Sequence, residues 1–585
     1  SDRVSFLRGD RTKEANQTGG YLRTRLSRQG DIVNSNIWYV GKPTSDYNLS
    51  SYQTFTNNHA NRIPMLYVGG NDGMLPGFSA IDGTEKIAYV PKGIYKNLSL
   101  LTKTDYTHRF YVDGSPFTGD VNISSTATAD WRTFLIGTLG AGGKGYFVLD
   151  ITNPGFTGST GVASNFSTSN AASLVIMDKT ADKNDTTFDS DIGHIFGDPV
   201  LAQGNQLRTS QITQLNNGRW AAVMGNGYNS TNEQAVLIIQ YLDGDKSIKK
   251  ISVGAAGDNG LSTPRLLDIN GDGLPDVAYA GDLKGNLWKF NIFSSDATDW
   301  AAAFSGTPLY SAVDASGTPQ TQPITTAPTL AQNSTVGGLM VAFGTGRNLS
   351  EGDRTDTTSV QTVYAVRDNT IYMEDPDAIP ENSKIKINNN ITPAVAGTGR
   401  INLVQQTVNT SSATDGQGTS SGDKFYTLSN NPVNYSSSGS NPNKRGWYLD
   451  LPVAGERVLN NIEFFAGTGV LEIISKVPGS GGNLEGESCD PVSTPEKTYR
   501  TFTSIQDGTR PTTVIMDTNG DGFFTVGDST TGNASGDPFT RGNASNVELK
   551  ISTGNNELRI GADGKTRSLP TPPLKLLRPS WRQLQ

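Results

Sequence analysis

A short hairpin pattern recurs along the chain and limits the folds that it can adopt. A β-branched or aromatic run ends in Gly, a polar turn of Gly, Asn and Asp follows, and a second apolar run ends near Asp or Asn. Clear copies occupy residues 66–83, 134–153, 221–244, 277–291 and 341–368, with a more degenerate copy at 446–451. Each copy predicts a β-hairpin, because Gly supplies the positive φ that tight turns require.

Repeated hairpins must stack on one another, since a single hairpin is marginally stable in water. The spacing of the copies is irregular, which favours radial repetition with loops of varying length. We therefore expect an all-β fold, a modified β-propeller of about seven blades with irregular loop insertions and calcium-binding hairpin loops. A β-sandwich is the structural alternative, but its strands would return to the same signature less often.

The whole chain, residues 1–585, is expected to form one decorated domain. Regular blades are expected over 1–372, a polar insertion rich in Asn, Ser, Thr and Gly over 373–442, and degenerate last blades with a second calcium loop over 443–585. Polar segments of this composition are typical of mobile surface loops.

Charge and cysteine content narrow the possible functions. The net charge of −8 and the pI of about 5.2 argue against a nucleic-acid partner and favour a cation or a basic protein surface. The single cysteine, Cys489, excludes a disulfide framework within the chain and leaves open a partner cysteine outside it.

No apolar run reaches the roughly 20 residues that span a bilayer. Because the chain opens with Ser1, it is interpreted as a processed product or an excised region of a longer protein.

The sequence DINGDGLPD carries the strongest chemical signal. Oxygen-bearing residues stand at loop positions one, three, five and nine, and Gly273 at position six permits a sharp reversal. A hard cation such as Ca²⁺ prefers six to eight oxygen ligands, which this alternation can supply. The predicted ligands are Asp268, Asn270, Asp272, the Leu274 carbonyl and Asp276. Tyr279 occupies position twelve, so this is a nine-residue loop of the kind found in hairpins, and Asx-turn hydrogen bonds alone are the metal-free alternative.

A second loop, DTNGDGFFTVGD, has the longer twelve-residue spacing. Its predicted ligands are Asp517, Asn519, Asp521, the Phe523 carbonyl and Asp528. Asp528 replaces the usual Glu at position twelve, and the shorter side chain predicts weaker or more magnesium-tolerant binding.

Other motifs carry little weight. The sequence GAGGKG (140–145) matches a dinucleotide fingerprint, but a strand-like run follows it where that chemistry needs a helix, so we expect a hairpin turn. The histidines are scattered and no nucleophile or acid–base arrangement stands out, so no catalytic site is assigned. Arg8, Gly9 and Asp10 form an RGD tripeptide, which serves integrin binding when displayed on a loop, and matches of three residues are common by chance.

Several stretches together resemble the C-terminal propeller of the PilC/PilY family of type IV pilus proteins. They run in order from one end of the chain to the other: LRGDR, GDIVNS, YVGGNDGMLPGF, YVPKGIYKNL, YVDGSP, GTLGAGGKGYFVLDITNP, GRWAAVMGNGYNS, NGLSTPRLLDINGDGLPDVAYAGDLKGNLWKF, FGTGR, GWYLDLP and SWRQL. The likeness fades between about Asp368 and Lys444, and Pro76 stands where the family usually has His.

The resemblance implies a secreted, non-enzymatic protein at the pilus tip on the cell surface, associated with the outer membrane in some settings. It implies Ca²⁺ as the ligand of the Asp268–Asp276 loop, with occupancy that tunes pilus extension against retraction. It also implies a role in twitching motility, virulence and adhesion, with minor and major pilins, the assembly machinery or a host-cell receptor as partners. An N-terminal region of the same protein would precede the chain.

Two alternatives remain at this point. A quinone-dependent dehydrogenase is one, because YVGGNDGMLPGFSAIDG is close to the blade repeats of such enzymes, although the chain lacks a vicinal cysteine pair. A purely host-receptor-binding adhesin is the other, and it overlaps the pilus function.

Overall fold

The computed structural model describes most of the chain. Described are residues 2–45, 47–158, 163–182, 185–202, 205–315, 320–375, 385–388, 399–415, 424–465, 468–479, 496–516, 518, 524–532, 536–544, 547–553, 556–561 and 566–570. Cys489 lies outside these residues.

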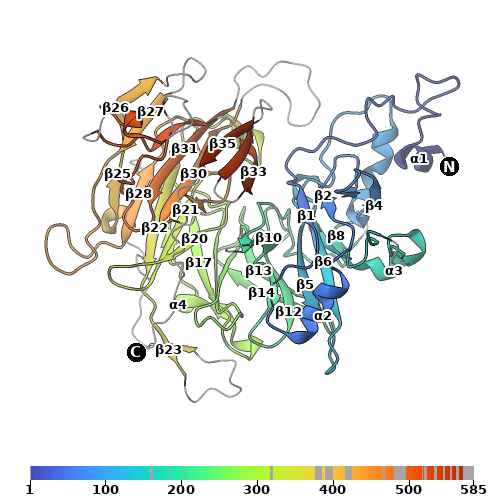
Figure 1. Ribbon diagram of the computed structural model, residues 1–585, viewed down its shortest axis with the longest axis horizontal. Coiled ribbons are helices and arrows are strands. Elements are labelled where there is room, and N and C mark those ends of the chain that lie inside the picture. Colours follow the sequence, from blue (N-terminus) through green and yellow to red (C-terminus); the bar gives the residue numbers. More distant parts are fainter. Residues whose placement is uncertain are drawn as a thin grey trace.

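Six sheets of four or more strands follow one another around the described part of the molecule (Figure 1). The first sheet consists of β1 (Trp38–Val40), β2 (Met65–Tyr67), β3 (Leu75–Ser79) and β4 (Glu85–Tyr89). The second consists of β5 (Phe117–Asn122), β6 (Trp131–Thr138), β7 (Gly145–Asp150) and β8 (Val175–Thr180). The third consists of β11 (Ile212–Gln214), β12 (Trp220–Gly225), β13 (Ala235–Tyr241) and β14 (Ile248–Val253). In each of these sheets the strands lie side by side in chain order, as consecutive antiparallel hairpins require.

The next three sheets are less regular. The fourth sheet consists of β15 (Arg265–Leu267), β16 (Val277–Gly281), β17 (Asn286–Asn291), β18 (Ala301–Ala302) and β19 (Tyr310–Ser311). The fifth consists of β20 (Thr329–Gln332), β21 (Leu339–Gly344), β22 (Thr362–Asp368), β28 (Gly446–Asp450) and β25 (Val404–Gln406). The sixth consists of β26 (Val408–Asp415), β27 (Lys424–Leu428), β32 (Arg541–Ala544), β31 (Lys497–Ser504), β30 (Val470–Val477) and β29 (Glu463–Phe464). The hairpin pattern in the sequence predicts about seven blades, and the described residues form six sheets of four or more strands.

The remaining elements are short. The strands are β9 (Leu201–Ala202) with β10 (Asn205–Thr209), β23 (Tyr372–Glu374) with β24 (Ile385–Ile387), and β33 (Val547–Thr553), β34 (Asn556–Gly561) and β35 (Thr566–Pro570). The α-helices are α1 (Asp2–Leu7), α2 (Ser50–Asn58), α3 (Ala171–Leu174), α4 (Ala303–Gly306) and α5 (Glu351–Thr355), and the 3₁₀ helices are η1 (Lys92–Thr102), η2 (Gly140–Gly142), η3 (Thr168–Asn170), η4 (Ala297–Asp299), η5 (Gly399–Asn402) and η7 (Val526–Asp528). None of the described helices is long and apolar enough to cross a membrane.

The five clear hairpin copies are confirmed as antiparallel strand pairs. They form β2–β3, β6–β7, β12–β13, β16–β17 and β21–β22, which are the two middle strands of four sheets and an inner pair of the fifth. Their residues are almost entirely buried, as in β13, where all seven residues are. Strands covered on both faces read as continuous apolar runs, which explains why these copies stood out in the sequence.

The degenerate copy at 446–451 behaves differently from the prediction. Its strand, β28, does not open a new blade but pairs with β22 in the fifth sheet, with Ala365 opposite Trp447. The sixth sheet contains the pair β30–β31, whose partners Val477 and Lys497 are separated by a long connection. A hairpin with so long a connection lacks the compact turn signature that the other copies share.

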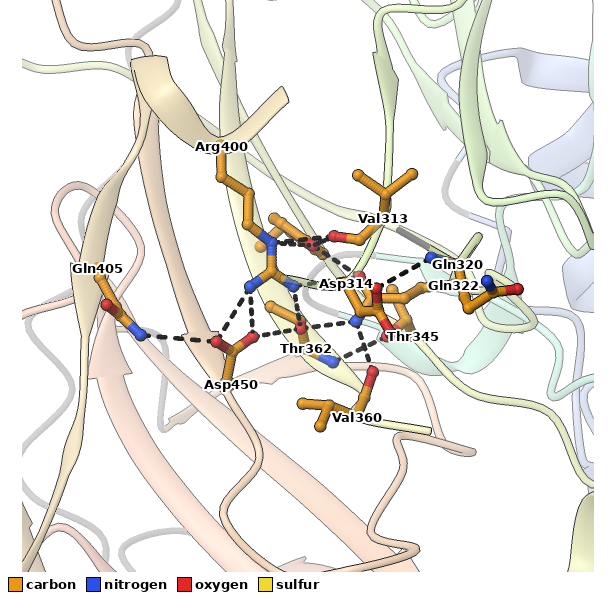
Figure 2. Close-up of polar contacts among 11 residues, drawn as sticks. Val313, Asp314, Gln320, Gln322, Thr345, Val360, Thr362, Arg400, Gln405 and Asp450 are labelled. Carbon is orange, nitrogen blue, oxygen red and sulfur yellow. Dashed lines mark hydrogen bonds and ion pairs between the residues drawn. The ribbon is translucent and has the colours of Figure 1, made fainter. Parts of the chain in front are cut away.

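Part of the segment expected to be a polar insertion, 373–442, is built into the sheets. Strand β25 adds to β28 in parallel, and β26 and β27 extend the sixth sheet. Arg400, in η5, ties this segment to the fifth sheet (Figure 2). Its guanidinium bonds both carboxylate oxygens of Asp450 at 2.8 and 3.0 Å and donates to the Thr362 hydroxyl at 2.8 Å and the Val313 carbonyl at 2.9 Å.

The hydrophobic core runs between neighbouring sheets. One cluster joins the first three sheets, and each of the following clusters joins one sheet to the next: the third to the fourth, the fourth to the fifth, and the fifth to the sixth. Because each sheet covers the apolar face of its neighbour, the sheets stabilise one another as stacked repeats do.

Polar contacts also join sheets that are distant in sequence. The buried ammonium of Lys289 on β17 lies 2.6 Å from the Asp368 carboxylate at the end of β22. Asp198 accepts a hydrogen bond from Asn36, just before β1, at 2.6 Å and one from Asn460, just before β29, at 3.4 Å. Asp198 thus joins the residues before β1, an edge strand of the first sheet, to those before β29, an edge strand of the sixth, as a ring requires.

Candidate calcium site

The first predicted calcium loop is the connection between β15 and β16. The strands pair up to Leu267 opposite Val277, so the nine residues 268–276 form the hairpin turn. Gly271 and Gly273 have φ angles of +78° and +90°, which side chains other than Gly rarely adopt. Tyr279, at position twelve, is buried in β16 and donates to Asp368 at 2.6 Å, so it faces the core and not the loop.

Main-chain N–H groups hold the carboxylates of this loop. Asp268 accepts from the amides of Gly271 and Gly273 at 2.7 and 2.8 Å, one on each oxygen. Asp272 accepts from the Leu274 amide at 2.9 Å and from the Asn270 side chain at 3.1 Å. Asx-turn chemistry therefore contributes to the loop, and each oxygen keeps further lone-pair capacity for a cation.

Asp276 is the most constrained of the five ligands. It is 1 % exposed, and its Oδ2 accepts from the Ile269 amide at 2.7 Å. Burial, together with the nearby carboxylates of Asp268 and Asp272, raises the pKa of Asp276 to about 7. Burial also raises the pKa of Asp268, with Asp272 adding to the effect. The three carboxylates thus lie close enough that their charges disfavour one another.

The donor set fits calcium in its chemistry. All five predicted ligands present oxygen, three of them as carboxylates, and hard cations prefer such ligands. Within the described residues, no three Asp, Glu, His or Cys side chains lie close enough to hold a metal ion as they stand. Apart from the adjacent residues, no atom lies within 4 Å of where a Cβ would stand at Gly271 or Gly273, so these two positions are open.

The second predicted loop is described only in part. Asp517, Asn519, Asp521 and Phe523 lie outside the described residues. Asp528, in η7, is fully buried and accepts from the amides of Thr518 and Thr525 at 2.8 and 3.0 Å. Its carboxylate therefore joins Thr518, near the start of the predicted loop, to Thr525, near its end. Calcium binding there stays a prediction.

The other motifs occupy structural positions. Residues 140–145 lead from η2 into β7, which is the hairpin turn that we expected between β6 and β7. In the RGD tripeptide, Arg8 and Asp10 are exposed, Gly9 has a φ of +99°, and the Asp10 carboxylate accepts from the Thr12 amide at 2.8 Å.

One contact to the first loop was not foreseen. Asn216, between β11 and β12 of the third sheet, donates to the Pro275 carbonyl at 2.9 Å. No spacing pattern marks this residue, since it is 52 positions before Asp268 and stands in an ordinary turn.

Comparison with known proteins places the chain in a family. Residues 29–384 match the family model described as the PilY1 beta-propeller domain. The type IV pilus biogenesis factor PilY1 of Pseudomonas aeruginosa strain PAK is 37 % identical over 483 residues, which cover 78 % of this chain and 36 % of that protein. A PilY1 homolog of Xylella fastidiosa is 36 % identical over 375 residues, 63 % of this chain and 27 % of that protein. The chain therefore spans about a third of the length of these curated relatives.

A solved structure agrees with the sequence match. The crystal structure of the P. aeruginosa PilY1 C-terminal domain superimposes with a TM-score of 0.65 at 28 % identity, covering 92 % of this chain and all of that one. The expected all-β propeller fold is thereby confirmed, and the chain belongs to the PilY1 β-propeller family.

Proposed function

We propose that this chain is a calcium-binding type IV pilus module that promotes pilus extension against retraction, and so supports twitching motility and adhesion to host surfaces. It would act at the pilus tip, outside the cell or on its surface, without enzymatic activity. Its partners would be minor and major pilins or the pilus assembly machinery, and a host-cell receptor in adhesion.

Two observations support the proposal. The relatives carry the name type IV pilus biogenesis factor, which states their role in building pili. The Asp268–Asp276 hairpin carries the calcium part of the proposal, because three carboxylates, an amide and a carbonyl share one nine-residue turn.

Each loop residue has a definable task. Asp268, Asn270, Asp272, the Leu274 carbonyl and Asp276 would hold Ca²⁺, which supplies the positive charge that neutralises the crowded carboxylates. Gly271 and Gly273 let the chain reverse, and the Ile269 amide holds one oxygen of Asp276 in place. Fixing both ends of the turn orders the surface around β15 and β16, which a pilus partner could then recognise.

Calcium titration calorimetry of the chelator-stripped chain tests the calcium part. Wild type should show two binding events, with Asp272→Ala removing the first and Asp521→Ala the second. Binding that is unchanged in both variants would show that these loops are only turns.

The pilus part requires the full-length protein in its piliated host. A strain carrying Asp272→Ala should display fewer surface pili and smaller twitching zones than wild type, and blocking retraction should restore the surface pili. Pilus numbers that stay at the wild-type level would contradict a role for this loop in opposing retraction.

A further inference from the structure

The side chain of Asn216 lies at the boundary between the third and fourth sheets. The residue follows β11 in the turn to β12 and is 2 % exposed. The turn itself is closed by main-chain bonds from the Leu215 amide to the Arg219 carbonyl and from the Gly218 amide to the Leu215 carbonyl. The side-chain amide takes no part in these main-chain bonds, so it can donate to groups of the neighbouring sheet.

Within the described part of the chain, the hydrogen bonds of this amide go to the end of the predicted calcium loop and to the residue that follows β17. Its Nδ2 donates to the Pro275 carbonyl at 2.9 Å and to the Ile292 carbonyl at 3.2 Å, and lies 3.5 Å from Oδ1 of Asp276. Ile292 directly follows β17, so one nitrogen joins both flanks of the hairpin to the third sheet.

The orientation of the amide follows from these partners. Turning it over would place Oδ1 against three oxygens, which repel it, so Nδ2 must face the loop. Oδ1 then has no hydrogen-bond partner among the described residues, which has a cost in stability for a buried acceptor. The contacts made by Nδ2 have to outweigh that cost.

Several hydrogen bonds fix Asp276, and among the residues that the structure describes Asn216 supplies the one from another sheet. The Asp276 amide donates to the Leu267 carbonyl at 2.8 Å, and its carbonyl accepts from the Ile292 amide at 2.9 Å. These are main-chain bonds of the hairpin itself. Asn216 adds a side chain, so it is the contact that substitution can remove without altering the loop sequence.

We infer that Asn216 is a positioning residue of the calcium site, and that the site therefore extends over two neighbouring sheets. By holding Pro275 and Asp276, it presents the ninth loop position to the cation, and it transmits the order of the filled loop to the β11–β12 turn. The inference rests on the proposed calcium binding at this loop. Partners that orient ligands in this way commonly change metal affinity about 10- to 100-fold when removed.

The test compares Asn216→Ala with Asn217→Ala in the chelator-stripped chain. Asn217 is the matched control, because it is half-buried in the same turn but donates to the Tyr241 hydroxyl at 2.8 Å. Calorimetry should show a dissociation constant for the first loop that is about tenfold or more weaker in Asn216→Ala. Asn217→Ala should bind as wild type does.

Hydrogen exchange on wild type gives a second readout that needs no variant at Asn216. Calcium should slow amide exchange in the turn 215–219, and Asp272→Ala should abolish that protection. If calcium binds in an Asp272-dependent way but neither Asn216→Ala nor this turn responds, the positioning role is wrong and the calcium site stands. If wild type shows no Asp272-dependent binding, both proposals are wrong.

Discussion

Asp113 shows how a single carboxylate bears on stability. It is 2 % exposed and accepts from the main-chain and side-chain amides of Asn34 at 3.2 and 2.6 Å. Burial raises its pKa from 3.8 to about 6, with the carboxylate of Asp31 adding to the rise. The folded protein therefore binds a proton at Asp113 more tightly than the unfolded chain does.

This shift predicts a pH dependence of a definite sign. The contribution of Asp113 to folding is most favourable below about pH 4, where the residue is protonated in both states, and falls as the pH rises to about 6. A pKa difference of about two units between the folded and unfolded states corresponds to about 3 kcal/mol in the free energy of unfolding. Asp113→Asn should thus gain stability relative to wild type by up to this amount between pH 4 and 7, measured by urea unfolding. Parallel curves for the two proteins would contradict the raised pKa.

Gly273 gives a second prediction at the residue scale. Its φ of +90° disfavours any side chain, whereas no neighbour within 4 Å would obstruct a Cβ. Gly273→Ala should lower the free energy of unfolding by about 1–2 kcal/mol through the backbone alone. Gly469→Ala is the control, because that position is equally open but has no positive φ, and it should change stability little. Equal losses in the two variants would show that backbone conformation is not the cause.

The predicted ligand residues could be nominated from the sequence because their chemistry is local. Asp268 to Asp276 lie in one turn, and the spacing of their oxygens is set by the loop itself. Asn216 could not be found in this way, since its contact with Pro275 depends on how two sheets pack.

At the scale of elements, the tie made by Arg400 is the most instructive. Its side chain is 11 % exposed and bonds Asp450 on β28 and Thr362 on β22 (Figure 2). It also lies 4.6 Å from the centre of the Tyr448 ring. These contacts hold η5, and with it the start of β25, against the fifth sheet.

Replacing Arg400 should loosen the edge of that sheet. Arg400→Met has a side chain of similar length but loses several charge-assisted hydrogen bonds, which contribute about 1.5–3 kcal/mol. We therefore expect amide exchange in β25 to accelerate by at least tenfold. Lys444→Met is the control, because Lys444 bonds the Ile401 carbonyl of the same 3₁₀ helix from the surface. Unchanged exchange of residues 404–406 in Arg400→Met would refute the tie.

The proposed calcium binding would link the Asp268–Asp276 loop to the stability of the whole molecule. A ligand that binds only the folded state at a hundred times its dissociation constant adds about 2.7 kcal/mol. Saturating calcium should therefore raise the midpoint of thermal unfolding of the chelator-stripped chain, and the rise should be smaller in Asp272→Ala. A midpoint that calcium does not move in wild type would contradict binding to the folded state.

The sequence by itself determined the local structure. Apolar runs joined by Gly-rich turns predicted five hairpins, and all five are strand pairs, because pleat periodicity and turn conformation depend on neighbouring residues. The same locality made the candidate calcium loop visible.

Only the tertiary structure decided how distant segments combine. It placed β28 in the fifth sheet, built β25 to β27 into sheets where loops were expected, and brought Asn216 to the candidate calcium loop and Asp198 between the first and sixth sheets. These contacts join residues far apart in the chain, and their formation depends on the packing of whole sheets, which no short stretch of sequence encodes.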